Sequence, residues 1–249
     1  MKTSQEWFNY FEHNLQKERI DWNLPATLTN KELTTILKSL QAWQLGETSD
    51  GCNLIKASKK YAATINDPHY VDAVRLFIKE EQKHGRNLGK YLDKIKQLRI
   101  TKNWGDSLFR KIRYFNNSME FWTLTVITVE CTAQLFYQSL KNATQCKLLK
   151  QICTDILIDE APHISFQMER LNTIFHQKKK WKQWPTFYCY KLFYFSTAFV
   201  VWMAHKKVFK AGGNNISHYF KLMNLKFTKT MGKLITTADA SIELKTIPA

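Results

Sequence analysis

The chain is poor in residues that interrupt helices or cross-link a fold. Its 249 residues include only 8 glycines and 5 prolines, and its 5 cysteines contain no Cys-x-x-Cys pair. Glycine and proline punctuate regular structure, so their scarcity favours a helix-rich globular chain over a disordered one. The absence of paired cysteines excludes a sequence-local rubredoxin or zinc-ribbon site and fits a reducing compartment. We therefore expect a helical protein of the cytoplasm.

A secretion signal and a clear membrane span are also lacking. Residues 1–6 show no basic segment followed by an apolar one. The longest aromatic and apolar stretch covers residues 186–204, which is close to the lower length limit for crossing a bilayer. Lys191 interrupts this stretch, and a lysine is costly in lipid. We expect a helix that packs on protein, and peripheral membrane contact stays open.

Acidic residues are scarce relative to basic ones. The chain has 21 Asp and Glu against 37 Lys and Arg, which gives a formal net charge of +16. Lysines cluster at residues 178–180 and at Lys206-Lys207. Such a balance suits acidic partners, namely nucleic acid, an anionic membrane surface or an anionic substrate. A solvated basic surface without a specific partner is the plainer interpretation.

Capping and breaking signals divide the chain into three parts. We expect an N-terminal arm over residues 1–28, a four-helix bundle over residues 29–180 and a C-terminal helical extension over residues 185–249. Thr29 with Glu32 and Asp67 with Pro68 are typical helix starts. The expected helices cover residues 30–65, 68–98, 106–141, 144–177, 186–210 and 216–229.

Two copies of Glu-x-x-His are the most informative pattern in the chain. They are Glu81-x-x-His84 and Glu160-x-x-His163, and each follows an isolated glutamate. Glu47 stands 34 residues before the first motif and Glu130 stands 30 residues before the second. Each pair of expected helices thus carries one Glu and one Glu-x-x-His, as a duplicated two-helix unit would.

The two motifs and the two isolated glutamates lie on the apolar faces of their helices. On the helix expected over residues 68–98, apolar residues recur in steps of three and four, and Glu81 and His84 take consecutive places among them. Buried carboxylates without partners are costly or retain protons. Two divalent cations would neutralise four carboxylates and accept one nitrogen from each histidine. We therefore predict a di-metal site formed by Glu47, Glu81, His84, Glu130, Glu160 and His163.

This ligand pattern resembles that of the ferritin-like di-iron carboxylate superfamily. The superfamily includes rubrerythrins, ribonucleotide reductase small subunits, aldehyde-deformylating oxygenases and tRNA hydroxylases. The resemblance covers residues 30–177 and implies an all-α ferritin-like four-helix bundle with two iron ions, two manganese ions or a mixed pair in each chain. It further implies that Glu47 and His84 bind one metal, Glu130 and His163 bind the other, Glu81 and Glu160 bridge both, and Asp159 orients His84.

Two departures from the superfamily pattern narrow the function. The rubredoxin half of standard rubrerythrins is missing, and Leu88 stands where the reductases carry their radical tyrosine. The resemblance implies an oxidoreductase that reacts with dioxygen or peroxide and oxidises an unidentified substrate, either anionic or hydrophobic. Two alternatives stay open. One is a tRNA-modifying di-iron hydroxylase, and the other is an iron- or peroxide-handling protein without an organic substrate.

Two glycines flank the first expected ligand. Gly46 and Gly51 remove side-chain bulk beside Glu47, where a substrate pocket could run, but close helix packing explains them equally well. Sites of this kind often contain an apolar cavity. The aromatic helix over residues 186–204 is our candidate for its roof.

Overall fold

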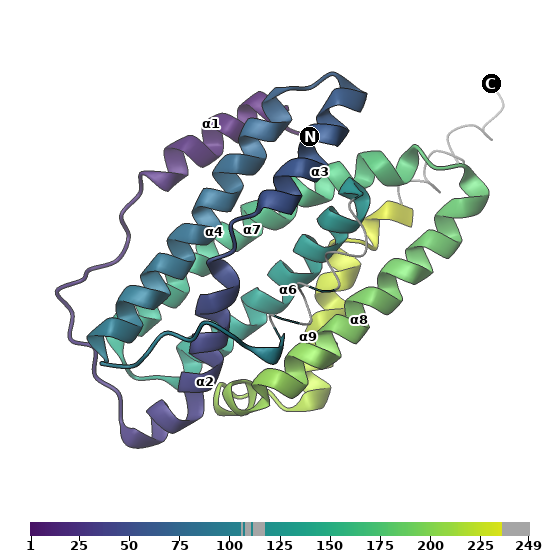
Figure 1. Ribbon diagram of the computed structural model, residues 1–249. Coiled ribbons are helices and arrows are strands. Elements are labelled where there is room, and N and C mark those ends of the chain that lie inside the picture. The colour runs from purple at the N-terminus through teal and green to yellow at the C-terminus, as the bar shows by residue number, and fades with distance from the viewer. Residues whose placement is uncertain (106, 108–110, 112–117, 236–249) are drawn as a thin grey trace, which may run out of the picture.

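A computed structural model describes residues 1–105, 107, 111 and 118–235, and all regular structure in those residues is helical (Figure 1). The bundle consists of α2 (Asn30–Glu47), α4 (His69–Lys94), α6 (Met119–Ala143) and α7 (Lys147–His176). Helix α2 packs on α4, α6 packs on α7, and α4 contacts α7 across the centre. The all-α four-helix bundle predicted from the sequence is therefore confirmed.

The first predicted helix is interrupted, and this interruption shapes the site. Residues 30–65 form two helices, α2 and α3 (Cys52–Ile65), instead of the single helix expected. Gly51 between them has a φ of 65°, and a Cβ there would lie 2.5 Å from Cδ1 of Ile78. Only glycine fits such a position without strain. The prediction of a continuous helix was wrong because the turn signal at residues 48–51 lies within an unbroken apolar periodicity.

The N-terminal arm contains a helix that sequence reasoning did not assign. Helix α1 (Ser4–Leu15) begins with a capping box between Thr3 and Glu6. Trp7 and Phe11 are buried, and their rings lie 5.4 Å and 5.3 Å from the ring of Phe166. Because α1 also packs along α4, the arm covers one side of the bundle.

Other helix bounds agree with expectation within about four residues, with two exceptions. Helix α8 (Lys180–Ala211) begins six residues before the expected start and contains Pro185, and the third bundle helix begins later than expected. Helix α4 follows Pro68 as predicted, and α7 begins at Lys147. The expected start of the third helix near residues 103–106 falls partly outside the described residues. Helix α6 itself begins after Ser118, whose hydroxyl accepts a hydrogen bond from the backbone N–H of Phe121 at 3.3 Å.

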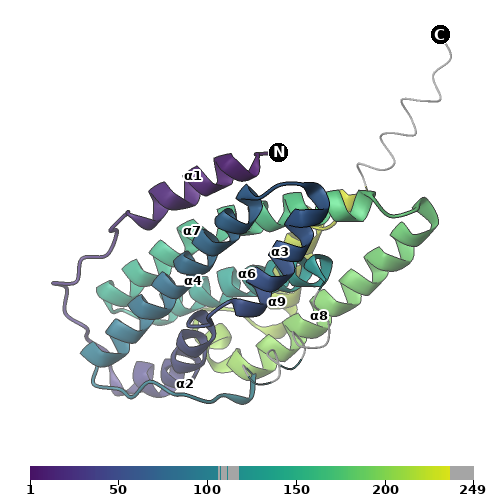
Figure 2. The ribbon, with the colours of Figure 1, turned by 45° about the horizontal axis from the view of Figure 1, so that its top comes forward.

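Two further helices follow the bundle, as the sequence predicted. Helix α8 (Lys180–Ala211) packs on α6 and α2, and α9 (Ile216–Lys229) packs on α8 and α6. Both ribbon views place α8 along the edge of the molecule away from α1 (Figures 1 and 2). No helix in the described part of the chain is long and apolar enough to cross a membrane. The expectation that residues 186–204 pack on protein is confirmed, since Tyr190, Tyr194 and Trp202 are buried.

Candidate metal centre

The predicted ligands converge in the core from four helices. Glu47 ends α2, Glu81 and His84 come from α4, Glu130 comes from α6, and Glu160 and His163 come from α7. Their ligand atoms form two groups, and within each group all ligand atoms lie within 4.8 Å of one another. One group is Glu47 with Glu81 and His84, and the other is Glu81 with Glu130 and His163. Glu81 belongs to both groups, which is the arrangement expected of a bridging carboxylate.

Glu160 lies beside these groups and lacks hydrogen-bond donors in the described part of the chain. Its side chain is fully buried, and neither carboxylate oxygen has a hydrogen-bond partner among the described residues. Its Oε2 is 3.7 Å from Nδ1 of His163. A buried carboxylate without a donor is costly, so this residue calls for a cation at the cluster.

Each histidine presents one ring nitrogen to the cluster and the other to a carboxylate. Nε2 of His84 lies 3.1 Å from Oδ2 of Asp159, while its Nδ1 has no hydrogen-bond partner in the described part of the chain. Nε2 of His163 lies 2.8 Å from Oε2 of Glu80, and its Nδ1 lies 2.8 Å from Oε1 of Glu81 without hydrogen-bond geometry. If each Nε2–H donates to its carboxylate, each Nδ1 keeps a lone pair for a metal.

The two orienting carboxylates occupy equivalent positions in the two motifs. Asp159 directly precedes Glu160, and Glu80 directly precedes Glu81. Each of them contacts the histidine on the opposite helix. The structure thus places Asp159 beside the histidine for which the sequence nominated it. Sequence reasoning missed Glu80, although its position in the first motif matches that of Asp159 in the second.

The N-terminal arm holds both orienting carboxylates. The side-chain amide of Asn14 donates to Oε1 of Glu80 at 2.7 Å and to Oδ1 of Asp159 at 2.8 Å. Nη1 of Arg19 lies 2.9 Å from Asp159 and 2.7 Å from Asp155, and its Nη2 donates to the Asn14 carbonyl oxygen. Asn14 and Arg19 were not predicted. The available signal was Asp155 and Asp159, two acids one turn apart on α7 that need a cation when buried.

The electrostatics of the cluster show whether a metal pair fits. Burial raises the pKa of Glu47 well above its usual value, and repulsion from Glu81 adds to this effect. Burial likewise raises the pKa of Glu130, with repulsion from Glu160 second. Burial alone would also raise the pKa of Glu81, but attraction to His163 and His84 outweighs it and lowers that pKa to about 2. Each ionised carboxylate therefore disfavours ionisation of its neighbours, and two divalent cations would offset that repulsion.

A tyrosine on α6 contacts one predicted ligand, although Leu88 on α4 occupies the position of the reductases' radical tyrosine. The Tyr137 hydroxyl on α6 donates to Oε1 of Glu47 at 2.8 Å in the buried core. Burial raises the pKa of Tyr137 well above its usual value, with the nearby Glu47 charge second. Tyr137 was not predicted as part of the site. Its hydroxyl fixes one oxygen of Glu47 and leaves the other for the cluster.

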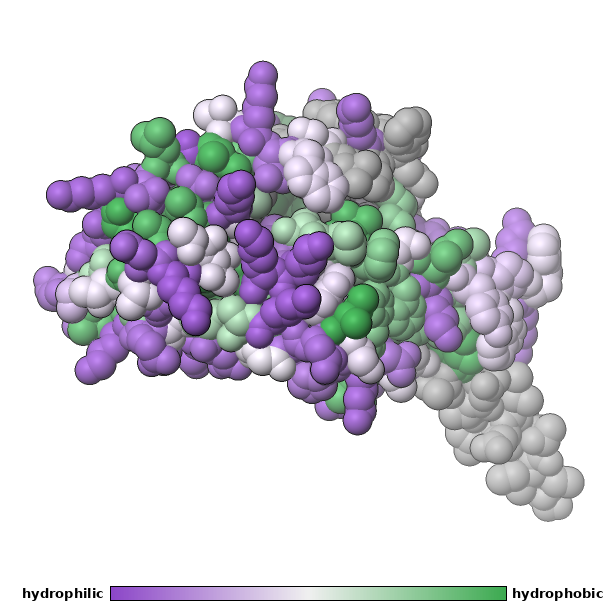
Figure 3. All heavy atoms as spheres, turned by 90° about the horizontal axis from the view of Figure 1, so that it is seen from below, coloured by the Kyte–Doolittle hydropathy of each residue, from purple (hydrophilic) through white to green (hydrophobic). Residues whose placement is uncertain are grey.

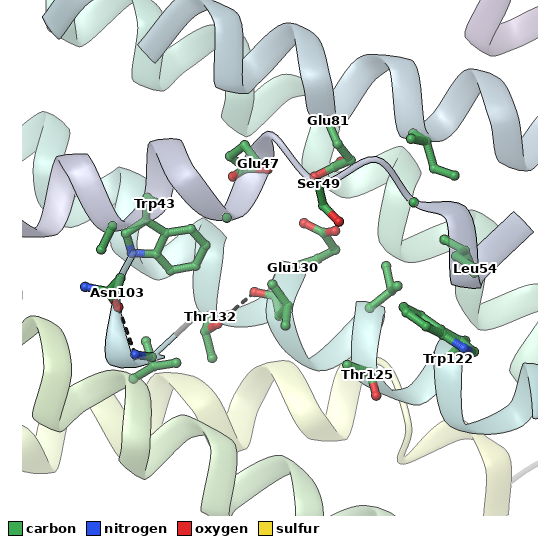
Figure 4. A pocket seen from close by; sticks show the side chains of 18 of the residues that line it. Trp43, Glu47, Ser49, Leu54, Glu81, Asn103, Trp122, Thr125, Glu130 and Thr132 are labelled. Carbon is green, nitrogen blue, oxygen red and sulfur yellow. Dashed lines mark hydrogen bonds between the residues drawn. The ribbon is translucent and has the colours of Figure 1, made fainter. Parts of the chain in front are cut away.

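A cavity of about 240 Å³ adjoins the cluster (Figure 4). Glu47, Glu81 and Glu130 line it, and the walls include Trp43 and Trp122 on either side of these carboxylates. Helix α8 supplies part of the wall through Val200, Val201, Ala204 and His205. The expected contribution of α8 is therefore present, although it comes from aliphatic side chains near the end of that segment and from His205 just beyond it, with no Phe, Tyr or Trp among them.

The two glycines beside Glu47 serve different purposes. Gly46 lines the cavity, and nothing lies within 4 Å of a Cβ built on it. Gly51 also borders the cavity, but its positive φ and its contact with Ile78 explain its identity. The two readings left open by the sequence thus divide between the positions, with open space at Gly46 and backbone geometry at Gly51.

Comparisons with known proteins place the fold. No protein-family profile matches the sequence, and no curated protein matches it. Solved structures do match. An R2-like ligand-binding oxidase with aerobically reconstituted Mn/Fe cofactor shares 16% identity at a TM-score of 0.68, over 91% of this chain and 92% of that chain. A mutant of such an oxidase with the same cofactor shares 15% identity at a TM-score of 0.65, over 92% and 93%.

The similarity to these structures extends beyond the bundle. A further mutant, with anaerobically reconstituted Mn/Fe cofactor, shares 16% identity at a TM-score of 0.60 over 92% of this chain and 94% of that chain. Coverage of this extent goes well past residues 30–177, to which the sequence resemblance was confined. The predicted ferritin-like fold is confirmed.

Proposed function

We propose that this protein is a di-metal oxidase that uses dioxygen to oxidise an organic compound bound beside two iron ions, two manganese ions or a mixed pair. The observation that carries the proposal is the shared use of three residues. Glu47, Glu81 and Glu130 belong to the ligand cluster and also line the cavity. A compound in that cavity would therefore lie directly beside the metals. The R2-like oxidases of similar fold, with their Mn/Fe cofactor, support the choice of metals.

In this proposal the six predicted residues hold the metal pair. Glu47 and His84 would hold one ion, Glu130 and His163 would hold the other, and Glu81 and Glu160 would contribute to both sites. Carboxylate oxygen and imidazole nitrogen together suit iron and manganese. The bound pair would supply redox chemistry with dioxygen as the oxidant.

The protein's own contribution is to orient ligands. Asp159 and Glu80 each contact Nε2 of one histidine, and with the proton on that nitrogen they would fix its ring and tautomer. Asn14 holds both carboxylates in place through its two donor contacts.

The cavity walls favour a mainly apolar compound. Trp43, Leu54 and Trp122 bring apolar surface to the cavity. The hydroxyls of Thr125 and Thr132 also face this region, but each donates to a backbone carbonyl of its own helix at 2.7 Å. They are thus engaged already, and the other polar lining comes from the carboxylates together with Ser49, Asn53, Asn103 and His205. This favours a small apolar molecule over the polar, bulky nucleotide that a tRNA hydroxylase must admit.

The test is a single-turnover reaction of the metal-loaded protein with oxygen. Protein loaded anaerobically with iron, or with manganese and iron, is mixed with oxygenated buffer in the presence or absence of aliphatic acids, alcohols and phenols. Stopped-flow absorption follows the metal, and mass spectrometry follows the organic compound. We expect at least one compound to be oxidised in proportion to the metal pairs present. Metal oxidation with release or storage of iron, and with every compound intact, would support metal handling instead.

A variant of Gly46 separates the cavity from the metal cluster. Gly46→Leu projects a side chain into the cavity, whereas Gly46→Ala adds one methyl group to a space with no neighbour within 4 Å. We expect the leucine variant to bind two metals and lose product formation, while the alanine variant retains both. Full product formation by the leucine variant would show that the cavity is not the substrate site.

A further inference from the structure

Most of the net positive charge of the chain lies in one segment without Asp or Glu. No Asp or Glu occurs between Glu169 and Asp239, whereas 13 Lys and Arg occur in the same 69 residues. The rest of the chain nearly balances, with 24 basic and 21 acidic residues. Helices α8 and α9 lie within this segment. The charge that the sequence shows is therefore a property of one region of the fold.

The outward side of α8 carries large apolar side chains. Six of them are between 47% and 71% exposed, namely Trp181, Trp184, Tyr188, Leu192, Phe199 and Met203. Their spacings of three, four and seven residues place all of them on one face of the helix. The stripe from the first to the last is about 33 Å long at 1.5 Å per residue. We call these six residues the α8 stripe.

Lysines bracket the α8 stripe. Lys179, Lys180 and Lys182 are exposed at one end, and Lys206, Lys207 and Lys210 are exposed at the other. Lys191 is exposed along its length. Figure 3 shows one face of the molecule, on which purple hydrophilic side chains project around green apolar ones. An exposed apolar helix face that carries Trp, Tyr and Phe, with lysines at its margins, is suited to contact with an anionic membrane surface.

We propose that the α8 stripe docks the protein on the surface of an anionic lipid membrane. The aromatic and aliphatic side chains enter the headgroup region, and the bracketing lysines contact lipid phosphates and carboxylates. Docking is peripheral, because no described helix is long and apolar enough to cross a bilayer. The proposal does not depend on the oxidation chemistry.

Charge and side-chain type favour a membrane over other partners. A second copy of the chain would bring two acid-free, lysine-rich faces together, and like charges repel at such an interface. Single-stranded RNA would engage the lysines and stack on aromatic rings, but Leu192 and Met203 offer no ring for a base. Anionic lipid satisfies both the lysines and the aliphatic side chains.

Vesicle sedimentation with the full-length protein tests the proposal. Large unilamellar vesicles of phosphatidylcholine alone, or of phosphatidylcholine with phosphatidylserine, are mixed with protein at low and high salt. We expect at least tenfold tighter binding to the mixed vesicles at low salt, and weaker binding as salt rises. No binding to either vesicle, or equal binding to both at all salt concentrations, would overturn the proposal.

Matched variants separate the α8 stripe from general charge and hydrophobicity. The Lys206→Gln/Lys207→Gln/Lys210→Gln triple variant should lose on the order of 100-fold in affinity for mixed vesicles. Its control replaces Lys56, Lys59 and Lys60 on α3, which are also exposed, by glutamine. Leu192→Ser should lose about tenfold, while its control Leu98→Ser, at a site 84% exposed, should not. Equal losses in the controls would contradict docking through α8.

Three further readouts distinguish a membrane from a second copy of the chain and from RNA. Brominated lipid should quench the fluorescence of Trp181 and Trp184, and Trp181→Phe/Trp184→Phe should remove that quenching. Sedimentation equilibrium should find no oligomer that Leu192→Ser dissociates, since such an oligomer would assign the stripe to a second copy. If RNA displaces the protein from vesicles, and Leu192→Ser binds vesicles as tightly as the natural chain, the lysines bind nucleic acid. That result would overturn the membrane proposal.

Discussion

The α2–α4 and α6–α7 helix pairs carry the same ligand types and hold them differently. In the first pair, Glu81 keeps 18% of its side chain exposed and lines the cavity, whereas its counterpart Glu160 in the second pair is fully buried. Glu47 ends its helix and accepts from Tyr137, whereas Glu130 lies within an unbroken helix. The two motifs thus have different surroundings, because Glu81 borders the cavity beside a helix break, whereas Glu160 is fully buried and Glu130 is the second-half ligand that lines the cavity.

The two halves nevertheless depend on each other. The carboxylate that contacts each histidine comes from the other half, Asp159 for His84 and Glu80 for His163. The arm then joins the two carboxylates through Asn14. A change in one half should therefore be felt at the metal of the other, and variants can test this.

The largest effect is expected from the glutamates proposed to bridge. Glu81→Ala and Glu160→Ala each remove a ligand of both metals, so paired binding should be abolished in either variant. Glu47→Ala removes a terminal ligand of one metal and should leave the other ion bound. Elemental analysis after anaerobic loading with iron measures the metals per chain. The same residual metal content in Glu47→Ala and Glu81→Ala would contradict the proposed roles.

The next effect concerns the crossed contacts between the halves. Asp159→Asn and Glu80→Gln keep the shape of each side chain and weaken its acceptance from the histidine. Each should lower the affinity for one metal by roughly ten- to a hundredfold. Asp159→Asn should act on the metal of His84, and Glu80→Gln on the metal of His163. Manganese titration followed by electron paramagnetic resonance gives the two affinities.

A double variant makes the crossing visible. In a Glu47→Ala background the metal of His84 is already lost, so adding Asp159→Asn should change little. Adding Glu80→Gln to the same background should weaken the remaining metal by the full factor. If Asp159→Asn instead weakens the remaining metal as strongly as Glu80→Gln does, the carboxylates act on the cluster as a whole.

A smaller effect should come from the tyrosine that distinguishes the first half. Tyr137→Phe removes one hydrogen bond to Glu47, which contributes about 1 kcal/mol to the free energy of unfolding of the metal-free protein. Two metals should still bind, with a changed spectrum for the ion at Glu47. Tyr219→Phe is the control, because its hydroxyl also donates one buried bond, to the carbonyl of Ala198 at 3.0 Å, outside the ligand cluster. A spectral change in the control as well would assign the effect to general packing.

The smallest effect concerns a contact that joins the halves at the start of α2. Glu32 accepts from the backbone N–H groups of Thr29 at 2.8 Å and Gln145 at 2.6 Å. These bonds lower the pKa of Glu32 to about 2. The ordinary pKa of glutamate is about 4.3. The stabilisation of the folded state by the Glu32 anion is therefore present above that pH and is lost as pH falls towards about 2.

Acid unfolding of Glu32→Gln measures that contribution. Because glutamine does not titrate, the variant should show a shallower fall in stability than the natural chain between the two pKa values. Circular dichroism with urea at several pH values gives the two curves. Parallel curves would mean that Glu32 is not held as an anion by its backbone donors.

The fold was predictable where local patterns decide it. Steps of three and four residues located the bundle helices, and Thr29 and Pro68 began helices where the sequence indicated. The break at residues 48–51 was missed because Gly51 is required by its contact with Ile78 on another helix. Helix α1 was missed even though Thr3 and Glu6 form a recognisable capping box.

The site was predictable to the extent that spacing carries it. Six residues of ligand type on inner helix faces indicated a cluster. The structure groups five of them, and Glu160 lies beside them, 3.7 Å from His163. Glu80 was within reach, since it repeats the position of Asp159. Asn14 and Arg19 were beyond reach, because their contacts with Asp159 span 145 and 140 residues and follow from how the arm packs. No local pattern encodes such contacts.

The most direct test of the account is the number and coupling of metals in the natural chain. Anaerobic loading with manganese, removal of free metal and elemental analysis should give two ions per chain. Electron paramagnetic resonance should then show a magnetically coupled pair, because Glu81 and Glu160 are proposed to bridge both ions. Fewer than one ion per chain, or two ions with the spectrum of isolated manganese, would contradict a bridged di-metal centre in this bundle.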